Sequence, residues 1–146
     1  MNRMRKVLIA DDEVKVGQLV KRLIQWDRLG LTCIGLVTDG QTTYEKILSE
    51  SPDIVITDIR MPVLTGLEMI QKASEQGVKC HFIVVSGYKY FDYAQKALKY
   101  GVEDYLLKPI DEDELNRQLQ KIVAEEEQRE DKQQQVDQIE KKLEDS

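Results

Sequence analysis

The stretch IVITDIRMP, residues 54–62, decides the fold, because a run with the character of a buried strand ends directly on a carboxylate. Ile54, Val55 and Ile56 show no polar alternation, which is typical of a parallel strand buried on both faces. Asp58 follows at the point where such a strand ends. Its side chain either caps a turn or does chemistry, and the rest of the chain has to distinguish these two roles.

Short apolar runs and helical patterns alternate around this stretch. The strand-like runs occupy residues 6–10, 32–37, 53–57, 81–86 and 104–107. Between them, apolar side chains recur every three or four residues over 16–24, 44–48, 67–73 and 91–100, and a further helix begins near Asp111. Five alternations of strand and helix predict an α/β fold, in which helices cover both faces of a parallel sheet.

Composition limits the classes of function. The 146 residues suffice for one domain with a sizeable core. No apolar run approaches the roughly 20 residues needed to span a bilayer, and the run after the basic start is too short for a signal peptide. We therefore expect a cytoplasmic protein without membrane contact. Cys33, Cys80 and His81 form no recognisable zinc set, so we expect structural roles for them.

Charge separates the last part of the chain from the rest. Residues 1–110 hold 15 basic and 14 acidic side chains, whereas residues 111–146 hold 6 basic and 13 acidic ones. Neither part has a basic face that would bind nucleic acid by itself. Beyond Ala124 the chain is polar until Val136, Ile139 and Leu143 return at helical spacing. Residues 126–146 are therefore predicted to be a charged helical tail, with a frayed linker as the alternative.

Polar side chains stand where the predicted strands end. Asp11, Asp12 and Glu13 follow the first strand, Asp58 the third, Ser86 closes the fourth, and Lys108 follows the fifth. In an open parallel sheet, ligands bind at this carboxyl edge. Each residue alone could be a helix cap or a solvated charge. Together, however, neighbouring carboxylates repel one another, and a cation would relieve that repulsion.

These residue types suit phosphoryl transfer. Carboxylate oxygens that retain several waters are ligands typical of Mg²⁺. Asp58 can attack phosphorus and become an aspartyl phosphate, while the cation neutralises the charge on the phosphoryl group. Lys108 can pair with one phosphoryl oxygen, and the hydroxyl of Ser86 can donate to another. The strand over 53–57 is then a rigid mount for a nucleophile.

Four segments in order, LIADDE, DIVITDIRMPVLTGLE, IVVSGY and GVEDYLLKPID, resemble the receiver domain of two-component response regulators over residues 4–125. The resemblance implies a flavodoxin-like, doubly wound, five-stranded parallel sheet of order 2-1-3-4-5, with five helices and the last extended into the acidic tail. It implies phosphorylation of Asp58 by a sensor histidine kinase. Mg²⁺ would be held by Asp11, Asp12, Asp58 and the backbone carbonyl of Arg60.

The resemblance also assigns the neighbouring positions. Ser86 and Tyr105 match the two switch residues, and Lys108 matches the family's lysine, followed by a cis Pro109. Gly87 and Tyr88 flank the site. We expect Arg60 and Tyr88 to hinder the water that would hydrolyse the acyl phosphate. Beyond its own phosphorylation and dephosphorylation, no enzymatic activity is expected.

Two sequence segments indicate a particular subgroup of receivers. SGYKYFDYAQKAL and DYLLKPID are similar to receivers attached to AraC-type DNA-binding domains. We therefore expect a receiver whose DNA-binding output domain is absent from this chain, with residues 126–146 as the linker toward it. Two surfaces are candidates for a homodimer, namely the face of the fourth and fifth helices and the C-terminal helix.

Three other functions compete with this reading. A pseudo-receiver would dock or dimerise without being phosphorylated. A phosphate-ester hydrolase with an aspartyl phosphate would usually carry an acid where Arg60 stands. A flavodoxin would follow the first strand with a Ser/Thr/Gly-rich phosphate loop rather than DDE.

Overall fold

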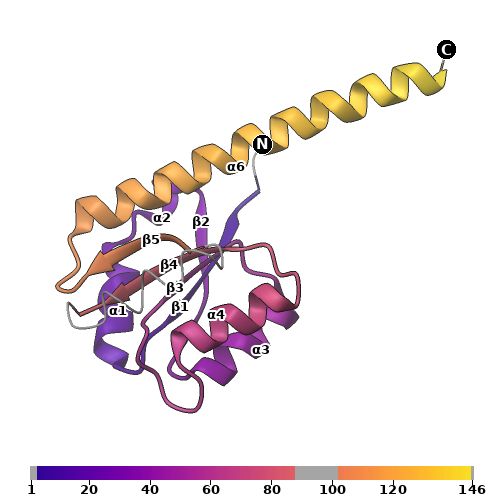
Figure 1. Cartoon of the computed structure of the whole chain (residues 1–146). Helices are drawn as coiled ribbons and strands as arrows, with labels where there is room; N and C mark the ends of the chain where they lie inside the picture. Colours follow the sequence, from indigo (N-terminus) through magenta and orange to yellow (C-terminus); the bar gives the residue numbers. More distant parts are fainter. Residues whose placement is uncertain (1–2, 88–101, 146) are drawn as a thin grey trace.

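The computed structural model describes residues 3–87 and 102–145, and its centre is one parallel sheet (Figure 1). The strands are β1 (Arg5–Ala10), β2 (Leu31–Val37), β3 (Ile54–Thr57), β4 (His81–Ser86) and β5 (Val102–Leu107). Every pair is parallel, and the order is β2-β1-β3-β4-β5. The predicted flavodoxin-like sheet is therefore confirmed.

Strand β3 lies in the middle of the sheet because all four of its residues can be buried. Ile56 stands between Ile9 of β1 and Ile83 of β4. Side chains of successive residues point to opposite faces, so Ile54 and Ile56 enter one core and Val55 enters the other. This double burial explains the lack of polar alternation in the sequence.

The helices form a layer on each face of the sheet. They are α1 (Val14–Leu23), α2 (Trp26–Leu29), α3 (Gly40–Glu50), α4 (Gly66–Glu75) and α6 (Glu112–Asp145). Helices α1, α2 and α6 cover one face, while α3 and α4 cover the other (Figure 1). The helix predicted over residues 91–100 lies outside the described residues.

Local sequence explains where two of these helices begin. Asp39 caps α3, because its side chain accepts the Thr42 N–H at 2.7 Å. Thr65 and Glu68 form a capping box at the start of α4. The one-turn helix α2 was not predicted, since four residues are too few to show a helical period. Its Trp26 donates a hydrogen bond from Nε1 to the carbonyl of Lys21.

Helix α6 runs without a break for 34 residues, so the tail is helical as far as Asp145. Leu115, Leu119 and Ile122 are buried against the sheet. Farther along, α6 projects beyond the sheet (Figure 1). On this last part of the helix, Val136, Ile139 and Leu143 are exposed. Among the residues that the structure describes, no helix has the length and apolarity required to cross a membrane.

Candidate functional site

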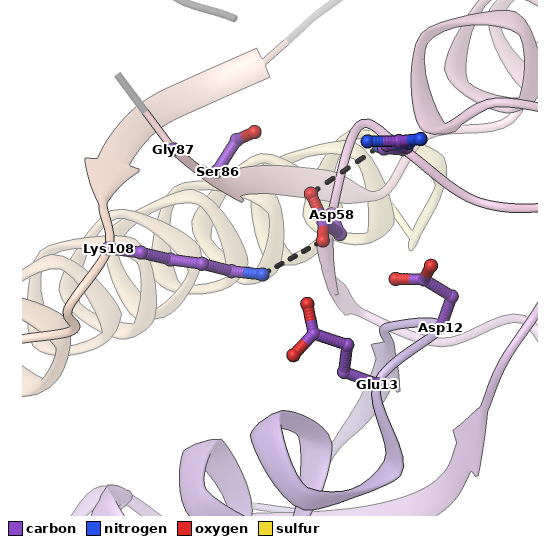
Figure 2. Close-up of a pocket in the computed structure, with 7 residues that line it drawn as sticks. Asp12, Glu13, Asp58, Ser86, Gly87 and Lys108 are labelled. Carbon is purple, nitrogen blue, oxygen red and sulfur yellow. Dashed lines mark hydrogen bonds and ion pairs between the residues drawn. The ribbon is translucent and has the colours of Figure 1, made fainter. Parts of the chain in front are cut away.

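The carboxyl ends of four neighbouring strands bring the predicted site residues together. Asp11 follows β1, Asp58 follows β3, Ser86 ends β4 and Lys108 follows β5. Because β1, β3, β4 and β5 are adjacent in the sheet, these side chains lie at one edge. Figure 2 shows Asp58, Ser86 and Lys108 around a pocket at this edge. The pocket has a volume of about 320 Å³ and is lined by Asp12, Glu13, Asp58, Arg60, Ser86, Gly87 and Lys108.

Lys108 connects two of the acids. Its Nζ lies 2.9 Å from Asp58 Oδ2 and 3.3 Å from Asp11 Oδ2. Burial alone would lower the pKa of Lys108, but the hydrogen bond and charge of Asp58, with that of Asp11, raise it. Lys108 therefore stays protonated and balances part of the negative charge in the pocket.

Backbone contacts fix the position of Asp58. The Ile59 N–H donates to Asp58 Oδ1 at 2.7 Å, and the Arg60 N–H donates to the same oxygen at 3.4 Å. Asp58's own N–H donates to the carbonyl of Ala10 at 2.9 Å, which ties the residue to the end of β1. Both carboxylate oxygens are thus engaged, Oδ1 by the backbone and Oδ2 by Lys108.

Three carboxylates gather at this edge of the sheet. One oxygen from each of Asp11, Asp12 and Asp58 lies within 4.8 Å of the others. Asp11 and Asp58 are buried, while Asp12 is exposed. Burial raises the pKa of Asp11 to about 6. A set of oxygen donors with one solvent-facing member fits a hard divalent cation that keeps part of its water shell, as Mg²⁺ does.

The hydroxyl of Ser86 is buried at the same edge. Among the described residues, it makes no hydrogen bond of regular geometry. The nearby Tyr105 hydroxyl donates instead to the carbonyl of Gly87 at 2.9 Å. Burial raises the pKa of Tyr105, and the neighbouring Ser86 hydroxyl opposes that rise. Ser86 thus offers a donor for a ligand oxygen, and the Tyr105 hydroxyl is its neighbour.

Two further positions complete the comparison with the sequence. The peptide between Lys108 and Pro109 is cis. Tyr88 lies outside the described residues. Sequence reasoning gave no role to two residues at the site. Glu13 lines the pocket, and only its position after the aspartate pair hinted at this. Gly66, the first residue of α4, lies against the backbone of Asp58, and no pattern in the sequence indicated this contact.

Residues 7–120 match the family model of the response regulator receiver domain. The chain belongs to this receiver family. The receiver is 45% identical over 122 residues to the transcriptional regulatory protein YesN of Bacillus subtilis, covering 84% of this chain and 33% of YesN. It is 34% identical over 120 residues to the transcriptional regulatory protein HptR of Staphylococcus aureus, covering 82% of this chain and 47% of HptR.

A solved structure is similar over nearly the whole receiver. The REC domain of AraT, a response regulator from Geobacillus stearothermophilus, shares 35% identity with a TM-score of 0.82. The likeness covers 87% of this chain and 98% of that one. The receiver therefore spans a third to a half of the length of YesN and HptR, but nearly all of the AraT domain.

Proposed function

We propose that this receiver is a phosphoacceptor of a two-component system, in which Asp58 takes a phosphoryl group from the phosphohistidine of a sensor histidine kinase. One observation carries the proposal. Asp58, Lys108 and the acids after β1 converge in a pocket where the buried Ser86 hydroxyl has no regular hydrogen-bond partner among the described residues. A pseudo-receiver, which is not phosphorylated, would not need carboxylates, a lysine and a serine hydroxyl in one pocket.

The chemical step follows from these positions. A carboxylate oxygen of Asp58 attacks phosphorus, and the bond from phosphorus to the histidine nitrogen breaks with its electron pair going to that nitrogen. Lys108 now bonds Asp58 Oδ2, and it moves to a phosphoryl oxygen as the acyl phosphate forms. The Ser86 hydroxyl donates to another phosphoryl oxygen.

Asp11, Asp12 and Asp58, together with the backbone carbonyl of Arg60, would hold Mg²⁺. When bound, the ion neutralises charge on the phosphoryl group during transfer. The oxygen-only donor set supports this choice of cation. Arg60 lines the pocket, where its bulk hinders the water that hydrolyses the acyl phosphate. Transfer to Asp58 and this hydrolysis are the only reactions we propose for the chain.

Phosphorylation is proposed to change the packing behind the pocket. As Ser86 moves toward the phosphoryl group, it vacates space beside Tyr105. Tyr105 can then leave the Gly87 carbonyl and turn inward. The result is a population shift between two packings, driven by a local change of charge.

The proposed output of the receiver is the regulation of transcription. YesN and HptR are transcriptional regulatory proteins longer than this chain, which supports a DNA-binding output domain, AraC-type by resemblance, joined through the tail. Residues 4–125 would then be the receiver and 126–146 the linker.

The apolar stripe on α6 supports a homodimer. Because Val136, Ile139 and Leu143 are exposed, a second copy of the chain could pack against them, so we also propose a homodimer through this helix. A cytoplasmic location belongs to the same proposal.

The test measures the intact mass of the protein after incubation with Mg²⁺ and acetyl phosphate. We expect one phosphate adduct, which is lost in Asp58→Asn and after chelation of the metal. An adduct that persists in Asp58→Asn would place the acceptor elsewhere. A folded protein that forms no adduct, even with histidine kinases, would favour the pseudo-receiver instead.

A further inference from the structure

A second cluster of charges lies at the opposite edge of the sheet, where the strands begin. Arg5 and His81 are the first residues of β1 and β4, and Asp53 directly precedes β3. Across from them, α6 presents Glu126 and Glu130. This cluster therefore joins the body of the receiver to the start of its tail, far from Asp58.

Arg5 is the centre of the first half of the cluster. Its side chain is only 2% exposed, and its Nη2 lies 3.0 Å from Glu130 Oε1. Among the described residues, Arg5 Nε and Nη2 make no hydrogen bond of regular geometry. A buried guanidinium needs a counter-charge, and Glu130 supplies it here. Arg3 reinforces the arrangement, because it binds Asp53 at 2.7 and 2.9 Å and lies 3.9 Å from Glu130.

Glu126 forms the second half. It is 5% exposed, and it is bonded by His81 Nε2 on one oxygen and by Arg129 on the other, the latter at 2.7 Å. Burial would raise the pKa of Glu126, but these two partners, His81 first, lower it overall. Glu126 thus lies on the sheet as a charged, paired group.

Helical geometry shows that these contacts continue the docking face of α6. At about 100° per residue, Glu126 lies about 20° around the helix from both Leu115 and Leu119, and Glu130 lies about 20° from Leu119. Both leucines are buried against the sheet. The stripe of Val136, Ile139 and Leu143 lies roughly 110° away around the same helix. The receiver therefore holds the helix by one face and leaves the stripe on another.

Most of this cluster is outside the part of the chain that matches the receiver family. The match covers residues 7–120, whereas Arg3, Arg5, Glu126 and Glu130 precede or follow it. The cluster thus joins two segments that the family match leaves out.

We propose that Arg3, Arg5, Asp53, His81, Glu126 and Glu130 form a linker clamp, which docks residues 126–130 on the sheet and fixes the direction in which the tail leaves the receiver. The functional boundary between receiver and linker then lies after Glu130 rather than at residue 125. The clamp does not depend on phosphorylation, so it goes beyond the function proposed for Asp58.

The test compares amide hydrogen exchange in two charge-matched double variants of the full chain. Glu126→Gln with Glu130→Gln removes the clamp charges from α6. Glu125→Gln with Asp131→Asn makes the same change in charge at exposed neighbouring positions. We expect exchange over residues 124–131 to rise about tenfold in the clamp variant and to stay at the native rate in the control.

Equal exchange in the two variants would overturn the clamp. If the clamp double variant fails to fold, Glu130→Gln alone serves, since Glu130 is 38% exposed. The same comparison then applies, with Asp131→Asn as its control. Phosphorylation of Asp58, measured by mass in every variant, is expected to be unchanged, so failure of the clamp and failure of the proposed phosphoacceptor are distinguished.

Discussion

Gly66 lies so close to Asp58 that a Cβ added to Gly66 would stand 2.0 Å from the Asp58 carbonyl oxygen. The N–H of Gly66 also donates to the neighbouring carbonyl of Ile59 at 2.7 Å. The first turn of α4 therefore packs directly against the backbone that carries Asp58.

This contact predicts that Gly66→Ala displaces the loop at Asp58. We expect it to slow phosphorylation by acetyl phosphate at least tenfold, because the backbone must shift by more than an ångström. Adduct formation against time, followed by intact mass, measures the effect. Gly17→Ala is the matched control, since a Cβ there meets nothing within 4 Å. A rate equal to that of the control would show that the loop can absorb the added methyl group.

Val63 offers a way to stabilise the fold. It has a φ of 70°, which β-branched residues rarely adopt, and its side chain is 84% exposed. Val63→Gly removes a left-handed strain of about 1–2 kcal/mol and adds about 0.5–1 kcal/mol of backbone entropy cost. We expect a gain of roughly 1 kcal/mol in the free energy of unfolding, measured in urea. Val63→Ala keeps the Cβ and is expected to gain less. Destabilisation by glycine would show that the valine side chain has contacts that matter.

Lys108 competes with any cation for the carboxylates of Asp11 and Asp58. Lys108→Met should therefore bind Mg²⁺ about tenfold more tightly, because a positive charge 2.9–3.3 Å from two carboxylate oxygens is removed. The same variant should accept phosphate more slowly, since it lacks the partner for a phosphoryl oxygen. Titration calorimetry measures the first effect, and Lys15→Met, an exposed lysine on α1, is its control. Weaker Mg²⁺ binding in Lys108→Met would contradict this reading.

Glu126 makes stability depend on acid pH. Its pKa in the folded protein lies below its ordinary value of 4.5, so it contributes stability at pH values above 4.5. That contribution is lost as the pH falls through the folded pKa. We expect the free energy of unfolding of the native chain to exceed that of Glu126→Gln at pH 7, and the difference to be smaller at a pH below 4.5. Urea titrations at both pH values measure it. A difference that does not change with pH would mean that Glu126 stabilises by packing alone.

The apolar stripe on α6 predicts weak self-association. Val136, Ile139 and Leu143 are 46%, 59% and 70% exposed, but three side chains per helix bury far less than the roughly 1,200 Å² of a stable interface. We expect Ile139→Asp to abolish dimers that sedimentation detects at high concentration, whereas Gln138→Asp leaves them. A dimer that survives Ile139→Asp would use another face of the receiver.

The sheet and most of the pocket could be predicted, because local sequence determines both. Runs such as Ile54 to Thr57 show their burial directly, and a strand's end places the next polar residue at the ligand edge. The contact of Gly66 with the Asp58 backbone could not be predicted, since it depends on how a loop folds back after its strand. The pairing of Arg5 with Glu130 was equally out of reach, because it joins residues near opposite ends of the chain whose charges look like ordinary surface groups.

The unbroken course of α6 also has a mechanical consequence. From Glu130, which is paired with Arg5 of β1, the helix extends about 22 Å to Asp145. A rotation of about 10° at its base would carry the far end sideways by about 4 Å, roughly the width of a side chain. The tail would thus act as a lever, because a small rotation where α6 meets the sheet becomes a larger displacement at the C-terminal end of the helix.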